Sequence, residues 1–251
     1  MKKNEYGRMF LVGRLILAIG TAGLGLVGLV ACDFIGPWEP VPASIPLHRV
    51  IAWLSGLVLI TCGAGLVGRR TMHASALVLA LFLLIWVVMF HGPRVTVEPG
   101  EVGRWLYLGE VLAIACGALM LWATPGHRMA ATVARLGFAL SLLTFGASHF
   151  AYLKATAGMV PAYIPAPMAL ACITGAAHLA AGVALLSNLL PRLAAALEAA
   201  MMSSFVLLIN VPDVLSSSTS REAWTALFAE GALVGAAWIV AAALREPAAP
   251  K

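Results

Sequence analysis

Two ionisable residues lie deep inside apolar stretches of the chain, and they are the first candidates for chemistry. His178 comes 13 residues after Pro165, and Glu198 comes six residues after Arg192. At the helical rise of about 1.5 Å per residue, His178 lies roughly 20 Å below one end of its helix and Glu198 roughly 9 Å above the opposite end. If both helices cross a hydrocarbon core of about 30 Å, these depths nearly coincide. The spacing predicts that the two side chains pair, either as a structural hydrogen bond or as a proton-handling pair.

A second group of polar residues is predicted near one end of the helices. Glu110 and Glu230 each lie about two turns inside an apolar run, and other polar residues fall close to the same level. If the helices bundle, the group lines one outward-facing polar pocket. Its predicted members are Glu110, Glu230, His91, Asn210, His149, Tyr107 and Tyr152.

Several common kinds of site find no support in the sequence. Cys32, Cys62, Cys116 and Cys172 form no C-x-x-C motif and no cluster with histidines, so neither disulfide exchange nor a metal site is predicted. A haem is not favoured either. Bis-histidine ligation needs facing residues at matched depth, and only His91 and His149 satisfy this requirement. No nucleotide-binding loop or nucleophile constellation occurs, so we do not expect an independent enzyme.

The composition explains why the polar residues are so sparse. Hydrophobic residues make up 61% of the 251 residues and charged residues only 11%, whereas about a quarter of the residues in a soluble domain are charged. The mean hydropathy is +0.94. These values predict an all-α integral membrane protein held in a lipid bilayer. The net charge of +5 then reflects topology rather than nucleic-acid binding, because the basic residues lie between the apolar runs.

The apolar runs predict eight transmembrane helices. We expect them at about 9–31, 50–67, from His73 to about 90, 105–123, 130–150, 168–186, from Pro191 onward and 224–244. His91 would then begin a polar connection that leads to the fourth helix. Leu29 to Cys32 also resembles a lipoprotein cleavage box, but an uncleaved first helix is favoured because the segment has a counterpart around Arg135 to Gly146.

The chain repeats a short phrase, which predicts a tandem duplication. V-P-A-S-I-P contains Pro42 and Pro46, and V-P-A-Y-I-P contains Pro161 and Pro165, 119 residues later. The same offset brings Gly56 onto Gly175, Gly63 onto Gly182 and Trp105 onto Trp224. We therefore expect two parallel four-helix units, at residues 1–125 and 126–251.

The basic residues predict the orientation in the membrane. Eleven of the sixteen lie on the side of the termini: Lys2, Lys3, Arg8, Arg14, Arg69, Arg70, Arg128, Arg135, Arg192, Arg245 and Lys251. The positive-inside rule then places both termini in the cytoplasm and both proline phrases outside.

The second half resembles the DoxX-like membrane proteins. The resemblance is carried by F-G-A-S-H-F-A-Y from Phe145, by T-A-G-M-V-P-A-Y-I-P from Thr156, and by Thr174-Gly175 and Ala181-Gly182. It implies a bacterial inner-membrane protein, and some relatives are associated with thiosulfate:quinone oxidoreductase or other membrane redox complexes. The family brings no invariant catalytic residue that can be carried over to this chain.

Three functional hypotheses follow from the residues and the resemblance. The first is an accessory or quinone-interacting subunit of a membrane redox system, with a redox partner protein. The second is a small-molecule or ion permease, and the third is a non-catalytic membrane scaffold. The sequence leaves a homo-oligomer open for each of them.

Overall fold

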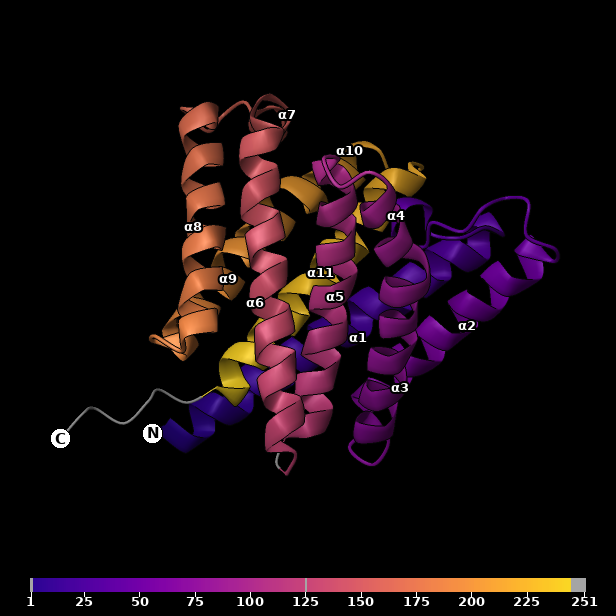
Figure 1. Cartoon of the computed structure of the whole chain (residues 1–251), viewed down its shortest axis with the longest axis horizontal. Helices are drawn as coiled ribbons and strands as arrows, with labels where there is room; N and C mark the ends of the chain where they lie inside the picture. Colours follow the sequence, from indigo (N-terminus) through magenta and orange to yellow (C-terminus); the bar gives the residue numbers. More distant parts are fainter. Residues whose placement is uncertain (1, 125, 245–251) are drawn as a thin grey trace.

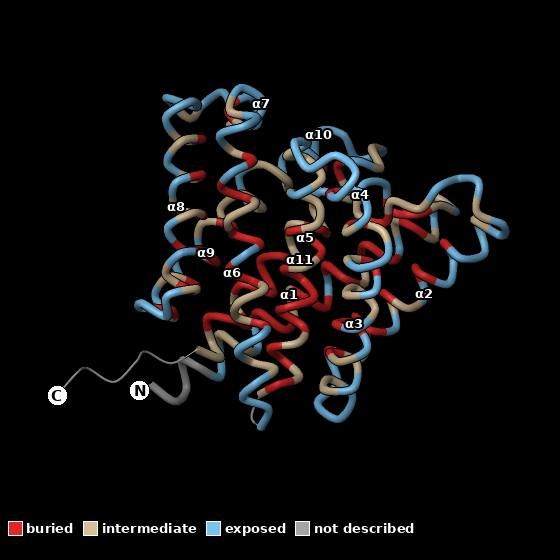
Figure 2. Tube along the Cα trace, in the orientation of Figure 1, coloured by how far each residue is buried: buried red, intermediate tan, exposed pale blue. Residues whose placement is uncertain are grey.

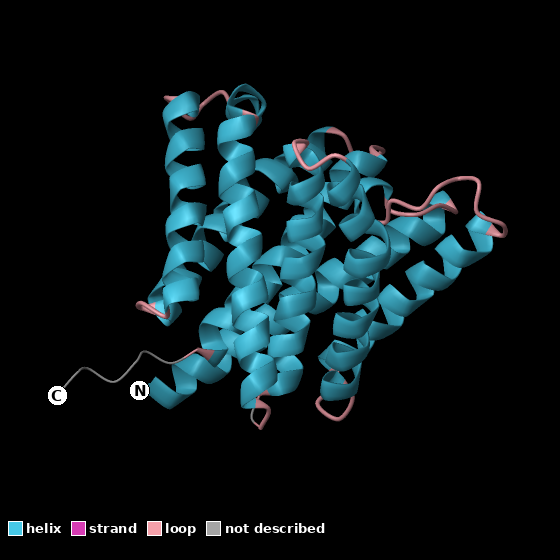
Figure 3. Cartoon of the chain, in the orientation of Figure 1, coloured by secondary structure: helices cyan, strands magenta, loops and turns pink. Residues whose placement is uncertain are grey.

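The protein is a bundle of helices that are long enough to cross a membrane. The structure is a computed structural model that describes residues 2–124 and 126–244 (Figure 1). Every regular element in these two ranges is a helix (Figure 3). Eight of these helical stretches are long and apolar enough to span a bilayer. The predicted all-α, multi-pass membrane fold is therefore confirmed.

The elements follow one another in the same order in the two halves. The first half contains α1 (Lys2–Ala31), η1 (Gly36–Trp38), α2 (His48–Val67), α3 (Met72–Trp86), η2 (Val87–His91), α4 (Gly92–Val97) and α5 (Val102–Ala123). The second half contains α6 (Arg128–Ala151), α7 (Leu153–Met159), α8 (Pro167–Ser187), α9 (Pro191–Phe205), η3 (Val206–Asn210), α10 (Val211–Ser216) and α11 (Arg221–Ala243). From α2 to α5, each element of the first half begins 119 residues before its counterpart in the second half.

The third transmembrane helix is longer than predicted, and the seventh has the same form. Instead of ending near Phe90, the third continues through the π-helical turn η2 into α4, so the prediction that His91 begins a polar connection is wrong. The π turn precedes Pro93, and the equivalent turn η3 precedes Pro212. Proline lacks the N–H that an α-helix needs, and the wider turn lets the helix pass the proline without stopping.

The proline phrases each lead into a left-handed residue. Leu47 (φ 59°) follows Pro46 and directly precedes α2, and Ala166 (φ 56°) follows Pro165 and directly precedes α8. Residues other than glycine rarely adopt this conformation. The phrases therefore fix the sharp entry of the chain into both helices.

The eight long helices form a ring, and a contact between two opposite helices crosses it. Along the ring, α1 packs on α2, α2 on α3, α3 on α5, α5 on α6, α6 on α8, α8 on α9, α9 on α11, and α11 on α1. Helices α5 and α11 also contact each other, and they lie at the centre of the view in Figure 1. This contact divides the ring into a first interior, beside α1, α2 and α3, and a second interior, beside α6, α8 and α9.

The two halves are joined by very close helix packing. A Cβ atom on Gly235 of α11 would lie 2.3 Å from the backbone nitrogen of Leu17 in α1, and one on Gly20 of α1 would lie 2.5 Å from the nitrogen of Ala232. The absent side chains let the two backbones touch, as small residues do in membrane helix pairs. Figure 2 shows the buried residues concentrated along α1, α5 and α11.

We expect Gly235→Ala to destabilise the protein, because the added methyl group has no room against the α1 backbone. Overpacking of this kind costs about 1–3 kcal/mol. Gly231→Ala on the same helix is the matched control, since nothing lies within 4 Å of a Cβ there. The measurement is the thermal midpoint in detergent. Equal midpoints for the two variants would contradict the close packing.

Candidate functional site

The second interior holds a group of acids and histidines, two of them buried and three half-buried, that come from five helices. They are Glu110 on α5, His149 on α6, His178 on α8, Glu198 on α9 and Glu230 on α11. We call them the acid–histidine cluster. A hydrogen bond joins His178 to Glu198, a ring contact joins His149 to His178, and electrostatic interactions join the two remaining glutamates to the group.

His178 and Glu198 form the most buried contact of the cluster. Nδ1 of His178 lies 2.6 Å from Oε1 of Glu198, and the two side chains are 3% and 0% exposed. The structure thus brings together the two residues that the depth argument paired. The second carboxylate oxygen of Glu198, Oε2, is buried and has no hydrogen-bond partner.

His149 extends the cluster toward the end of the bundle that carries the proline phrases, the loop end. Its ring centroid lies 4.9 Å from that of His178. Nδ1 of His149 lies 2.9 Å from the carbonyl oxygen of Phe145. A carbonyl oxygen can only accept, so Nδ1 carries the hydrogen and Nε2 of the neutral ring is left as an acceptor.

Glu110 and Glu230 connect the cluster to the central helices. Glu230 interacts electrostatically with His178 and Glu198, and Glu110 interacts with Glu230. Oε2 of Glu110 is buried without a hydrogen-bond partner, and so is Oδ1 of Asn210 at the end of η3. Glu110 belongs to the first half of the chain, so the cluster requires both halves.

The equivalent positions of the first interior are apolar. Counting back 119 residues from His178, Glu198 and Glu230 gives Leu59, Leu79 and Val111. These three residues line a cavity of about 30 Å³ among α1, α2, α3 and α5. Glu110 and Glu230 miss the 119-residue offset by one position, and the element bounds give Val111 as the structural counterpart of Glu230.

Glu39 is a buried acid that was not among the predicted site residues. It closes the loop end of the first interior and is only 7% exposed. It accepts hydrogen bonds from the Ser55 hydroxyl and from the backbone nitrogen of Ile35. Burial raises the pKa of the Glu39 carboxyl, although both hydrogen bonds act in the opposite direction. The apolar residues that flank Trp38 and Glu39 gave no signal of this burial.

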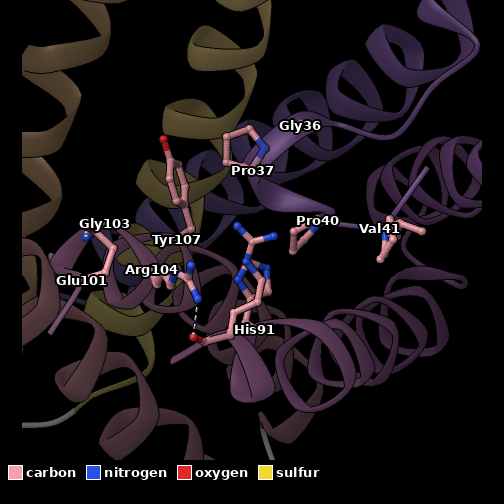
Figure 4. Close-up of a pocket in the computed structure, with 11 residues that line it drawn as sticks. Gly36, Pro37, Pro40, Val41, His91, Glu101, Gly103, Arg104 and Tyr107 are labelled. Carbon is pink, nitrogen blue, oxygen red and sulfur yellow. Dashed lines mark hydrogen bonds between the residues drawn. The ribbon is translucent and has the colours of Figure 1, made fainter. Parts of the chain in front are cut away.

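A much larger cavity opens at the loop end of the first half. Its volume is about 700 Å³, and Figure 4 shows Pro37 and Pro40 across the cavity from Arg104. It is lined by Gly36, Pro37, Pro40, Val41, Pro42, His91, Arg94, Glu101, Gly103, Arg104 and Tyr107. We call it the loop-end cavity.

Hydrogen bonds hold the polar walls of the loop-end cavity in place. Arg104 lies 2.6 Å from Glu98 and donates to the carbonyl oxygen of Arg94 at 2.9 Å. Nε2 of His91 lies 3.0 Å from the carbonyl oxygen of Trp38, so it carries the hydrogen and Nδ1 faces no protein donor among the described residues. Conformational freedom in these walls is therefore small.

Tyr152 joins the loop-end cavity to the second half. Its hydroxyl donates to Glu101 and accepts from the backbone nitrogen of Gly103 at 2.9 Å. The hydrogen bond from Tyr152 lowers the pKa of the Glu101 carboxyl and raises the pKa of the Tyr152 hydroxyl. Glu101 also caps the start of α5 by accepting from Gly103.

The residues predicted to line one outer pocket are therefore divided between two places. His91 and Tyr107 line the loop-end cavity, and Tyr152 contacts it through Glu101. Glu110, Glu230 and His149 belong to the acid–histidine cluster, and Asn210 lies at the end of η3. Tyr107 connects the two places, because it interacts electrostatically with both Glu110 and Tyr152. Over the described ranges, no group of three or more acidic, histidine or cysteine side chains could hold a metal ion.

These features define a polytopic α-helical membrane protein with protonatable groups concentrated in one of its two interiors. Residues 130–210 match the DoxX family model, so this part of the second half is similar to the DoxX family. The match runs from α6 through η3 and includes His149, His178 and Glu198. Comparisons with curated proteins and with solved structures gave no match.

We expect His178→Leu and Glu198→Leu each to destabilise the protein, because each leaves one buried polar group unpaired. Breaking a buried pair costs about 3–5 kcal/mol. The double variant recreates the Leu59 and Leu79 arrangement of the first interior, so it should be more stable than either single variant. A double-mutant cycle of thermal unfolding in detergent measures this coupling. Independent, additive losses would show that the pair contributes nothing to stability.

Glu39 should make stability depend on pH. The fold favours the protonated carboxyl of Glu39. Its contribution to the free energy of unfolding is therefore fully present when the pH is below 4.5, the ordinary pKa of a glutamate, and is lost as the pH rises through the raised pKa. Glu39→Gln stays neutral, and its thermal midpoint should exceed that of the wild type by a margin that grows as the pH rises above 4.5. Asp213→Asn, on an exposed residue, is the control and should follow the wild type. A margin that is constant with pH would refute this assignment.

Proposed function

We propose that this protein is a quinone-interacting accessory subunit of a redox system in the bacterial cytoplasmic membrane. The observation that carries the proposal is the loop-end cavity, which combines apolar walls from Pro37, Pro40 and Val41 with the polar side chains His91 and Arg104. Its volume of about 700 Å³ is in the range of small-molecule sites. The DoxX match supports the same reading, because the resemblance implies partners in membrane redox complexes.

The residues of the cavity fit the chemistry of a quinone head group. A quinone has two carbonyl oxygens that accept hydrogen bonds, and its reduced form has two hydroxyls that donate them. Arg104 and Arg94 are donors in the cavity wall, and Nδ1 of His91 is an acceptor because Nε2 is held by Trp38. A bound quinone would supply the electron-transfer chemistry, and these side chains would bind and orient it.

The proposal includes a two-unit architecture and an orientation. The units are residues 1–125 and 126–251, supported by the common spacing of the elements and by the two π turns. Both termini are cytoplasmic, supported by the excess of basic residues at that end. The loop-end cavity then faces outward, where a partner redox protein can approach it.

A small-molecule or ion permease is the second candidate function. It is favoured by the acid–histidine cluster, because ionisable side chains inside a membrane often mark a transport pathway. Proton-coupled uptake into vesicles that is lost in Glu110→Gln or Glu230→Gln supports this candidate. If neither quinone binding nor uptake is detected, the non-catalytic membrane scaffold is the hypothesis that remains.

Quinone binding to the purified protein should be saturable and should depend on His91. A short-chain benzoquinone is titrated in detergent, with quenching of tryptophan fluorescence as the signal, because Trp38 contacts His91. His91→Asn introduces the residue of the equivalent position, and we expect the Kd to rise about tenfold, the effect of losing about 1.4 kcal/mol.

The matched control is Asn210→Ala, which changes the equivalent position in the second half and should leave the Kd unchanged. Quinone binding that does not saturate, or an unaltered Kd in His91→Asn, would remove the basis for a quinone site in this cavity.

A further inference from the structure

The acid–histidine cluster has more acidic groups than its surroundings can neutralise. Three carboxyl groups, Glu110, Glu198 and Glu230, share one apolar interior with two histidines. In the part of the chain that the structure describes, no lysine or arginine forms an ion pair with any of the three. A net charge in the membrane interior is costly, so the cluster needs bound protons to approach neutrality.

The cluster also leaves buried hydrogen-bonding atoms unused. Oε2 of Glu198, on a residue only 2% exposed, has no partner, and neither has Oε2 of Glu110. Buried polar atoms in structural networks are normally satisfied, so unpaired ones indicate a missing bound species. A proton, with or without a water molecule that carries it, satisfies such an oxygen.

The fold itself does not require these groups. The first interior is built from helices of the same order and length, and it has Leu59, Leu79 and Val111 at the three equivalent positions. An apolar interior is therefore sufficient for helix packing in this architecture. The polar groups of the second interior need another explanation than stability.

Protonatable side chains connect the cluster to the loop end of the bundle. Gly103, Tyr107 and Glu110 follow one another on α5 at spacings of four and three residues, so they share one face of that helix. The backbone nitrogen of Gly103 donates to the Tyr152 hydroxyl at 2.9 Å. The hydroxyl of Tyr107 points away from His91 in Figure 4. Tyr152 donates a hydrogen bond to Glu101, whose side chain is exposed in the wall of that cavity.

Between the cluster and the end of the bundle opposite the loop end, most of the buried side chains are apolar. Toward the end of the bundle where α1 begins, the fully buried residues below the cluster are Phe138 and Leu142 on α6, Leu185 on α8 and Ala195 on α9. Ser141 is also buried there, and its hydroxyl is bound to the carbonyl oxygen of Gly137. Arg135 on α6 also donates to the carbonyl oxygen of Leu185, so the layer contains two polar side chains, each bound to a backbone carbonyl oxygen, and is otherwise mostly apolar.

We propose that the acid–histidine cluster is a proton-binding site that exchanges protons with the loop side of the membrane through Tyr107, Tyr152 and Glu101. The titratable groups that face it are Glu110 and Tyr107 from α5, His149 from α6, His178 from α8, Glu198 from α9 and Glu230 from α11. One proton enters at the Glu101 carboxylate, each hydroxyl on the route releases one proton and accepts another, and the cluster gains one proton. No electron moves. This inference goes beyond the quinone proposal and does not depend on it.

The first experiment measures protonation directly, without any quinone. Infrared difference spectra of the full-length protein in detergent are recorded between acidic and alkaline pH, and the carboxylic-acid C=O band is integrated. Glu230→Gln and Glu198→Gln should each remove part of the pH-dependent band, whereas Glu222→Gln, exposed at the start of the same α11 helix as Glu230, should remove none of the buried component. The decisive spectrum is that of Glu39→Gln, which removes the buried carboxyl outside the cluster. A buried carboxyl band that is independent of pH in this variant would overturn the proposal, and this outcome does not depend on any cluster variant folding.

The second experiment tests the route and its direction. The protein is reconstituted in liposomes, and its orientation is determined by labelling the exposed Cys32 with an impermeant maleimide. A pH jump on the loop side should change the buried carboxyl band at least tenfold faster than a jump on the other side.

Tyr107→Phe keeps the ring and removes the hydroxyl. It should slow the loop-side response at least tenfold without changing the total band at equilibrium. Equal rates from both sides, or an unchanged rate in Tyr107→Phe, would overturn the route. Failure of quinone binding leaves both results unaffected, so the two proposals are tested separately.

Discussion

The absence of water in the hydrocarbon core is the constraint on which the whole structure depends. A polar group inside the bundle must find its partner within the protein, and an unpaired charge there is costly. The chain meets this constraint with helices, whose backbone groups bond internally, and with very few polar side chains between them. The exceptions, Glu39 at the loop end of one interior and the acid–histidine cluster in the other, are therefore the informative residues. Glu39 is satisfied by Ser55 and Ile35, whereas two carboxyl groups of the cluster retain an unpaired oxygen.

Helices of each half pack against helices of the other half, and this arrangement determines which residues can meet. Because α1 packs on α11 and α6 packs on α5, neither half closes its own bundle. The close approach at Gly20 and Gly235 is what makes this arrangement possible, since any side chain there would separate the backbones. As a result Glu110, from the first half, reaches a cluster whose other four members come from the second half. A site of this kind is absent from an isolated four-helix unit.

The sequence predicted the features that depend on regular geometry. Apolar runs of about 20 residues gave the eight spans, and counting the helical rise from Pro165 and Arg192 placed His178 and Glu198 at one level. The predictions that failed depend on local departures from that geometry. The π turn before Pro93 carries the third helix past its expected end near Phe90 and places His91 inside a span. The 119-residue offset was visible in the sequence and already aligns Glu230 with Val111 rather than with Glu110, and the element bounds of α5 and α11 have the same offset.

The two interiors show how a duplicated fold can separate two tasks. Both are surrounded by equivalent helices, so their packing requirements are the same, yet where the first has Leu59, Leu79 and Val111 the second has two glutamates and a histidine. The loop-end cavity lies over the apolar interior, and the acid–histidine cluster lies in the other. Helix α5 serves both, with Glu101 and Tyr107 at the cavity and Glu110 in the cluster. Less than three helical turns therefore separate the wall of a ligand-sized cavity from a buried carboxyl group, on one rigid element. Binding in the cavity and protonation of the cluster act on the same helix, so each can influence the other without any large movement of the bundle.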